Sequence, residues 1–378
     1  MRAVEGVDRW IFLGWPVTPE GLAIVRILYA GLGLVIGTPR WAWAGRLPHA
    51  LWNPEPGPLR LLPGPPGPIV MVALQMVFVA ALVALLVGWR TPAMSVAVTV
   101  IGATGFGITY AMGNYDHSFM GVLTPAVLAP SGWGARWSVD AAQGRRPDVE
   151  GWPVRLLAWL LGLAMLTSAY PKIRSGWLDV HSHAVLGQLA SQYFVHGRHA
   201  LLATQSIHLQ VGGFWELFDD LTVLVEGGFV FAVLTVSGTR LWTAMAAVFH
   251  AAVLLMINIP FSANLLVYIA FVDWSFISRR FETSMPHPRV GWFVRLARHR
   301  AAGVLVVAAG LGYAAFCAAY DALLPALLSL VTDRSDFLAQ VSLVLLGGAI
   351  GLWYLLSQLL KVAAALVPGR RPGPRPAV

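Results

Sequence analysis

PIVMVALQMVFVAALVALLVG, residues 68–88, has no charged side chain and one polar side chain, that of Gln75. As an α-helix this stretch extends about 30 Å, which is roughly the thickness of the hydrocarbon core of a bilayer. A helix bonds all its backbone groups internally, so it can cross lipid without leaving polar groups unsatisfied. The stretch therefore predicts a transmembrane helix and places the chain among all-α membrane proteins.

Apolar stretches of similar character recur on both sides of this one. The chain is 57% hydrophobic and 12% charged, and its mean hydropathy is +0.67, values outside the range of soluble domains. We expect a polytopic transmembrane helix bundle of about eight to ten spans. The candidate spans are 19–38, 68–88, 92–112, 116–131, 153–171, 219–237, 240–259, 262–278, 302–324 and 338–362.

The fourth span differs from the others because it is short and contains two prolines. Residues 116–131 include Pro125 and Pro130, each of which removes a backbone donor from a helix. Such a segment is tolerated in a membrane where neighbouring protein covers the freed backbone groups. We expect a tilted, broken or re-entrant helix here.

Basic residues determine the expected orientation. The net charge is +8 and the isoelectric point is about 10.1, but the arginines lie in short loops between spans, which is typical of topology signals and argues against nucleic-acid binding. Residues 279–300 and the tail, 364–378, are strongly basic and are expected in the cytoplasm. Counting spans then places both termini in the cytoplasm and the segments 39–67 and 172–218 outside.

These features divide the chain into four parts. We expect a transmembrane domain over 1–278, a basic cytoplasmic loop over 279–300, an additional transmembrane hairpin over 301–363, and a disordered cytoplasmic tail over 364–378.

Lys172 is one of only two lysines in a chain that has 26 basic residues. An arginine keeps its proton in any ordinary protein setting, whereas a lysine in a poorly solvated site can become a neutral amine and act as a base. The alternative is a lysine that extends from the end of a span towards the membrane surface. Both interpretations remain open on the sequence alone.

Ionisable or polar residues inside spans are costly and are candidate functional groups. His117, in the outer turn NYDHSF, faces the same compartment as Lys172. His250 lies in the middle of the seventh span, and Asn258 follows on nearly the same face of that helix. His250 is either a ligand donor or a histidine bonded to a neighbouring helix, and His117 is either a site residue or a solvated turn residue.

Two further charges inside spans are expected to have structural roles. Glu226 must be paired, protonated or hydrated, and either Lys172 or Arg26 can be its partner. Arg26 is the one charge inside the first span.

The outer segment contains several histidines but little else that binds metal. Spacings of the type H-x-H and H-x-x-H can chelate, yet acidic and cysteine partners are not nearby, so we expect no metal site. The histidines are His181, His183, His196, His199 and His208.

Four segments together resemble the HTTM family, the membrane region that is shared with vitamin K-dependent gamma-carboxylase. The segments are GLAIVRILYAG (21–31), DHSFMGVLTPAVLAPSGWGARWSVDAA (116–142), AYPKIRSGWLDVHS (169–182) and VFHAAVLLMINIPFSANLLVYIAFVDW (248–274). The resemblance covers roughly residues 17–278. Beyond them this chain has two spans and a basic tail, where the carboxylase has a large extracytoplasmic domain.

The resemblance implies a site on the extracytoplasmic side. Lys172 matches the lysine that deprotonates a reduced quinone, and His117 and His250 match the histidines of the carboxylase, so these three are the expected catalytic residues. Trp177 completes the family's K-x-x-x-x-W pattern, and Asp116 stands where the family has asparagine. The residues expected to hold the cofactor are Asp116, Ser118, Trp177 and Asn258.

The implied cofactor is a reduced naphthoquinone or menaquinol-like quinol, with O2 and CO2 if the carboxylation chemistry is kept. The implied partners are the lipid bilayer of a bacterial cytoplasmic membrane and a secreted peptide or partner protein. An alternative function is a non-enzymatic membrane scaffold, or a maturation or export factor for a secreted peptide toxin. A transporter is less favoured, because the sequence shows neither an inverted repeat nor a matched pair of broken helices.

Overall fold

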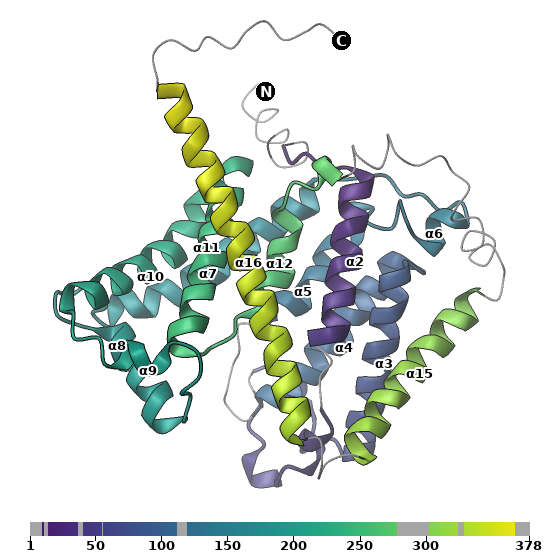
Figure 1. Ribbon diagram of the computed structural model, residues 1–378. Coiled ribbons are helices and arrows are strands. Elements are labelled where there is room, and N and C mark those ends of the chain that lie inside the picture. The colour runs from purple at the N-terminus through teal and green to yellow at the C-terminus, as the bar shows by residue number, and fades with distance from the viewer. Residues whose placement is uncertain are drawn as a thin grey trace, which may run out of the picture.

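A computed structural model describes residues 10, 14–36, 41–54, 56–111, 119–277, 302–323 and 329–366. Within these residues the secondary structure is helical throughout (Figure 1). The long helices are α2 (Pro19–Ile36), α3 (Pro68–Val87), α4 (Thr91–Tyr110), α7 (Trp152–Arg174), α10 (Gly212–Ala232), α11 (Val236–Ile257), α15 (Ala302–Leu323) and α16 (Ser329–Leu366). The shorter helices are α5 (Phe119–Leu128), α6 (Val139–Ala142), α8 (Ala184–Ala190), α9 (Ala203–Ile207) and α12 (Ser262–Tyr268), with short turns η2 to η7 between them.

The predicted all-α transmembrane bundle is confirmed. Six of the described helices are long and apolar enough to cross a membrane: α2, α3, α4, α7, α11 and the part of α16 from 337 to 365. Three other predicted spans are shorter apolar helices, at 119–131, 262–271 and 302–312. The predicted span 219–237 corresponds to α10, which begins earlier, at Gly212, and is outside this group of six.

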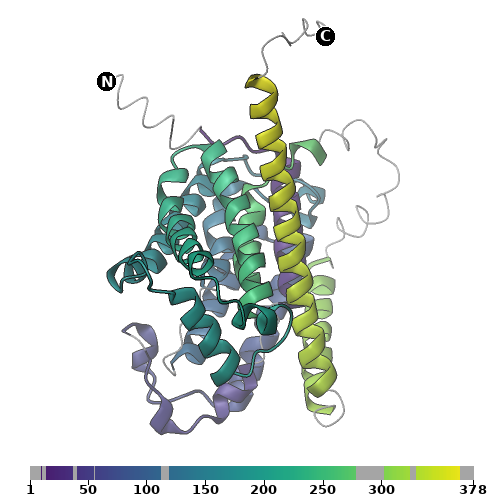
Figure 2. The same ribbon diagram turned by 60° about the vertical axis from the view of Figure 1, so that its left-hand side comes forward.

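The helices pack around a core formed by α2, α3, α4, α5 and α12 (Figure 1). The start of α2 and the end of α16 lie at the same end of the bundle in both views, in agreement with an even number of crossings between them (Figures 1 and 2). At one side α7 and α10 pack against each other, α8 packs against α10, and α9 packs against α8 and α11. The two termini, the predicted cytoplasmic loop 279–300 and the tail 364–378 fall largely or wholly outside the described residues.

The proline-containing segment forms the short helix α5, which runs through Pro125 and ends in the 3-10 turn η5 (Ala129–Ser131), and neighbours bond its freed backbone carbonyls. Pro125 lies inside α5 and has no N–H, so the carbonyl of Gly121, four residues earlier, loses its helical partner. The hydroxyl of Tyr29 donates to that carbonyl at 2.7 Å, and the hydroxyl of Thr99 donates to the carbonyl of Val122 at 2.9 Å. These contacts explain why a proline-containing helix is stable within the bundle.

Arg26 has no exposed surface, and its guanidinium donates hydrogen bonds to main-chain carbonyls. A cation at the C-terminal end of a helix interacts favourably with the unpaired carbonyls there, and Arg26 reaches the last turn of α3 in this way. Its acceptors are the carbonyls of Leu85, Leu86, Trp133, Arg136 and Trp137. Arg26 therefore joins α2, α3 and the segment after α5.

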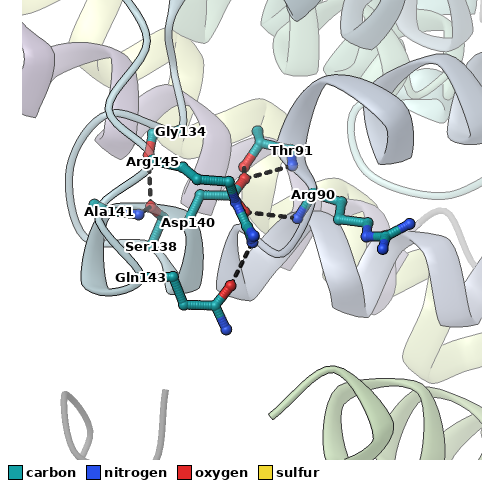
Figure 3. A network of polar contacts seen from close by, with 8 residues as sticks. All are labelled: Arg90, Thr91, Gly134, Ser138, Asp140, Ala141, Gln143 and Arg145. Carbon is teal, nitrogen blue, oxygen red and sulfur yellow. Dashed lines mark hydrogen bonds and ion pairs between the residues drawn. The ribbon is translucent and has the colours of Figure 1, made fainter. Parts of the chain in front are cut away.

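Asp140 organises the same end of the bundle (Figure 3). Its residue is only 4% exposed, and its carboxylate accepts from the N–H groups of Arg90 and Thr91 at 3.0 and 2.7 Å, at the beginning of α4. The Thr91 hydroxyl donates to it at 2.8 Å, and the Arg145 guanidinium at 2.6 Å. A carboxylate that bonds N-terminal amides stabilises a helix start, so Asp140 fixes α4 to the connection that leads to α7.

Among the described residues, the last two helices pack against earlier helices of the bundle. Helix α15 packs against α3, and α16 packs against α11 and α12. A Cβ placed on Gly310 of α15 would come within 2.7 Å of the Cα of Ala80, and one placed on Gly348 of α16 would come within 2.5 Å of the Cβ of Ala251. The predicted additional hairpin is therefore integrated into the first bundle, with glycine allowing close helix contacts.

Candidate functional site

Lys172 and Glu226 form an ion pair between α7 and α10. The Nζ of Lys172 lies 2.5 Å from the Oε2 of Glu226 and 3.2 Å from the carbonyl oxygen of Ser168. The two charged side chains are 23% and 13% exposed, respectively. Of the two partners that the sequence allowed for Glu226, the structure selects Lys172 and not Arg26. A carboxylate and an amine in direct contact can exchange a proton. Such an exchange would leave Lys172 as the neutral amine that the predicted base requires.

Trp177 covers this pair. Its indole ring lies 5.4 Å from the Nζ of Lys172, a cation–π distance, and it packs against an apolar cluster. The buried members of that cluster are Val185, Leu189, Ala203, Trp215 and Ile257. The predicted K-x-x-x-x-W pair thus forms a contact, and it connects the ion pair with the end of α11.

Asp219 holds the segment that carries Trp177. It has no exposed surface, and its carboxylate accepts from the hydroxyl of Ser182 at 2.9 Å and from the N–H groups of Ala184 and Val185 at 2.8 and 2.7 Å. Through these bonds α10 caps the beginning of α8. Sequence reasoning missed this residue, although a carboxylate within an apolar helix was a signal that could have indicated it.

His250 lies between two aromatic rings of the same neighbouring segment. The Phe261 ring is 4.6 Å from the imidazole at an interplanar angle of 14°, and the Tyr268 ring is 5.8 Å from it at 11°. His250 is 4% exposed. Stacking of this kind fixes the plane of the imidazole within the bundle.

Asn258 ends α11 with a left-handed backbone conformation, φ 62°, which asparagine tolerates better than most residues. Part of the reason for an asparagine here is therefore structural. Its side chain is nevertheless buried, and among the described residues its Oδ1 has no hydrogen-bond partner. An acceptor in this state is suited to a hydroxyl donor supplied by water or by a ligand.

Tyr268 is a further polar residue of this region that sequence reasoning missed. It is 3% exposed, and its hydroxyl has no hydrogen-bond partner among the described residues. Leaving a buried hydroxyl unpaired costs about 1–3 kcal/mol, so the group needs an explanation. No sequence signal distinguishes this tyrosine from others in spans, because its lack of a partner is a property of the packing.

The remaining predicted site residues are not joined to this group by the described structure. Asp116, His117 and Ser118 lie outside the described residues. Arg26 is bonded to carbonyls of α3 and of the segment after α5, as described above. A cleft of about 160 Å³ lies near the start of α2, lined among others by Trp15, Arg240 and Trp274, and the predicted site residues do not line it.

The outer histidines make separate local contacts. The Nδ1 of His183 lies 2.7 Å from a carboxylate oxygen of Glu216, and the Nε2 of His199 lies 2.9 Å from the carbonyl oxygen of Tyr193. Across the described part of the chain, three or more metal-binding side chains do not come together in one group.

Comparison with protein-family models, with curated proteins and with solved structures finds no match for this chain.

Proposed function

We propose that this chain is an enzyme of the bacterial cytoplasmic membrane whose chemistry is like that of vitamin K-dependent carboxylase. Lys172 acts on the extracytoplasmic side as the base that takes a proton from a reduced quinone, and the reaction modifies a secreted peptide or a lipid-soluble substrate. The observation that carries the proposal is the Lys172–Glu226 contact inside an apolar helix bundle. Charges in such a place are costly and are most often kept for function.

One proton is shared between Lys172 and Glu226. When the Lys172 ammonium passes its proton to the Glu226 carboxylate, both groups become neutral, and the free amine can then accept a proton from an acidic hydroxyl. A neutral acid and a neutral amine cost less to bury than two separate charges, so apolar surroundings lower the cost of this transfer. Trp177 and its apolar cluster limit the access of water to the amine.

The residues present fit a reduced quinone. A flat apolar ring with hydroxyl groups requires apolar walls and a few hydrogen-bonding groups, and the buried acceptor of Asn258 lacks a partner among the described residues. Lys172, Trp177, His250 and Asn258 are the described residues that we assign to holding it. When bound, a reduced naphthoquinone supplies the electrons for O2 and, through that reaction, a base strong enough to create a carbanion that CO2 can trap.

Oxygen uptake and quinone epoxide formation test this proposal. Purified protein in lipid nanodiscs is given a reduced naphthoquinone, and wild type is compared with Lys172→Arg, which keeps the positive charge but cannot supply a free amine. We expect the variant to lose at least about 100-fold in rate, the usual contribution of a general base. The matched control is Arg174→Lys, an exposed basic residue in the same helical turn, which should keep full activity. Equal rates for Lys172→Arg and wild type would refute the role of Lys172.

A second function, that of a scaffold or export factor for a secreted peptide, is favoured by one observation. Val180, Phe194 and Val195 are 72–76% exposed in the segment predicted to lie outside the membrane. Exposed apolar groups in such a position suit a protein or peptide partner. This function predicts that a partner co-purifies after mild solubilisation and is lost from a Phe194→Ser variant, while Lys172→Arg retains it.

A further inference from the structure

The cleft near the start of α2 lies at one end of the bundle, between helices that enter the membrane. Its volume is about 160 Å³, and it is lined by the first two turns of α2, the beginning of α11 and the segment that follows η7 (Ile269–Phe271). Helices α2 and α11 are both long and apolar enough to cross a membrane, and η7 packs against both of them. A cleft beside the beginnings of two spans lies at the level of the lipid headgroups.

Two side chains of opposite charge line this cleft. The Nη1 of Arg240 lies 3.1 Å from the Oδ2 of Asp273, and its Nε donates to the carbonyl of Phe271 at 3.3 Å. A guanidinium has five N–H donors, so Arg240 can also donate to a further acceptor. The Asp273 side chain is 53% exposed, and a carboxylate has about four acceptor positions. Both groups can therefore bind a ligand while they remain paired with each other.

Two indole rings form walls of the cleft, and each is held in place. Trp15 is 4% exposed, and its ring lies edge-on to the ring of Phe271 at 5.8 Å. The indole N–H of Trp274 donates to the carbonyl of Ile269 at 2.9 Å, which fixes Trp274 against η7. Indole faces attract cations, and tryptophan favours the interface between membrane and water.

The size of the cleft limits what it can hold. Its volume is close to that of a protein cavity of about 150 Å³ that binds benzene. A group of this size is smaller than a whole lipid, so the cleft suits a headgroup whose acyl chains lie outside it, along the apolar helix surfaces.

We propose that this cleft binds the headgroup of a zwitterionic phospholipid that carries a primary ammonium, as phosphatidylethanolamine does. The phosphate accepts hydrogen bonds from Arg240, and the ammonium donates to Asp273 and lies against an indole ring. A headgroup that is only anionic meets the like charge of Asp273, and a choline headgroup has no N–H to donate to it. The proposed reaction uses other residues, so this inference is independent of it.

Native mass spectrometry of the full chain in detergent tests the inference. Phosphatidylethanolamine, phosphatidylcholine and phosphatidylglycerol with identical acyl chains are titrated into wild type and into Asp273→Asn, and the bound lipids are counted. The matched control is Glu20→Gln, because Glu20 lies in the first turn of α2 and pairs with Arg136 at 3.1 Å, outside the lining of the cleft.

We expect wild type to bind phosphatidylethanolamine about 10-fold more tightly than the other two lipids, the effect of one charge-assisted hydrogen bond. Asp273→Asn should reduce this preference to within about two-fold, and Glu20→Gln should keep it. Equal binding of the three lipids by wild type would overturn the inference, as would an unchanged preference in Asp273→Asn.

A variant that fills the cleft tests its role without removing a charge. Val272 lines the cleft and is 37% exposed, so Val272→Trp adds bulk there while Arg240 and Asp273 remain. This variant should lose the preference for phosphatidylethanolamine. If it keeps the preference, the lipid binds elsewhere and the inference is wrong.

A soluble headgroup distinguishes a lipid from a free zwitterion of the same chemistry. Glycerophosphoethanolamine carries the same phosphate and ammonium but has no acyl chains. We expect it to displace the lipid only at concentrations at least about 100-fold higher, because it lacks the apolar contacts of the chains. Binding as tight as that of the lipid would show that the ligand is a soluble compound, which overturns the assignment to a lipid.

Discussion

When a lysine and a glutamate are in contact inside a membrane bundle, the stability of the protein depends more on keeping both residues than it does for an exposed pair. Removing one partner leaves the other charge buried in poorly solvated surroundings, and the loss exceeds the value of the pair itself. For Lys172 and Glu226, which are 23% and 13% exposed, solvent moderates that effect. The pair should therefore show strong coupling between its two residues.

A double-mutant cycle measures this coupling. We expect Lys172→Met and Glu226→Gln each to lower the free energy of unfolding by about 1–3 kcal/mol, and the double variant to lose clearly less than the sum. The matched control is the Arg240–Asp273 pair at 3.1 Å, whose carboxylate is 53% exposed. The cycle Arg240→Met with Asp273→Asn should give a coupling of at most about 1 kcal/mol. Additive losses at Lys172 and Glu226 would contradict the description of them as a buried pair.

At the scale of single elements, α8 is stable because α10 caps it. This helix has only seven residues, too few for stability on its own, and the carboxylate of Asp219 accepts the N–H groups of Ala184 and Val185 at its start. The neighbouring Asp220 is exposed on the same helix. The two adjacent carboxylates therefore provide a test of the capping role.

Amide hydrogen exchange measures the capping of α8 by Asp219 directly. In Asp219→Asn the side-chain NH2 group replaces one carboxylate oxygen and cannot accept a hydrogen bond from a backbone N–H. The remaining amide oxygen is neutral and accepts more weakly than a carboxylate oxygen, so the capping of α8 is reduced. We expect the amides of 182–190 to exchange about 10-fold faster in this variant, equivalent to a loss of about 1 kcal/mol. Asp220→Asn should leave their exchange unchanged. Similar exchange in the two variants would show that α8 is held by its apolar contacts alone.

At the scale of the whole molecule, α15 and α16 close the bundle by lying on two different helices. The contact between α15 and α3 depends on Gly310, where an added Cβ would come within 2.7 Å of backbone. Backbone cannot move aside as a flexible side chain can, so the two helices would have to separate. Gly312, two residues later, has nothing within 4 Å of an added Cβ.

Thermal unfolding of two alanine variants tests how far the bundle depends on this contact. Gly310→Ala should lower the melting temperature, with a loss of about 1–3 kcal/mol from the forced separation. Gly312→Ala should be neutral or slightly stabilising, because alanine favours a helix more than glycine does. Equal stability of the two variants would mean that α15 is only loosely attached to α3.

The sequence predicted the architecture well because each helix that crosses the lipid bilayer must be long and apolar, whatever its neighbours are. The stretch that forms α3 is apolar except for Gln75, and the prolines of 116–131 indicated a helix with unbonded carbonyls, of which Gly121 bonds Tyr29. The sequence also limited the partner of Glu226 to Lys172 or Arg26, because a charged side chain inside a span requires a partner of opposite charge.

The sequence could not predict contacts whose partners are defined only by packing. Asp219 and Asp140 bond backbone N–H groups that lie 35 and 49 residues away, and a backbone donor has no residue type to recognise. The hydroxyl of Tyr268 has no hydrogen-bond partner in the described part of the chain, a property that depends on packing. Helix α10 begins before its predicted limit because polar residues continue an otherwise apolar helix.

The attachment of α15 to α3 and of α16 to α11 also has a consequence for biosynthesis. Ribosomes make these two helices after the helices that they cover, so the glycine- and alanine-lined surfaces that include Ala80 and Ala251 face lipid or the insertion machinery while translation continues. The time needed to translate residues 279–366 thus sets how long these surfaces remain uncovered.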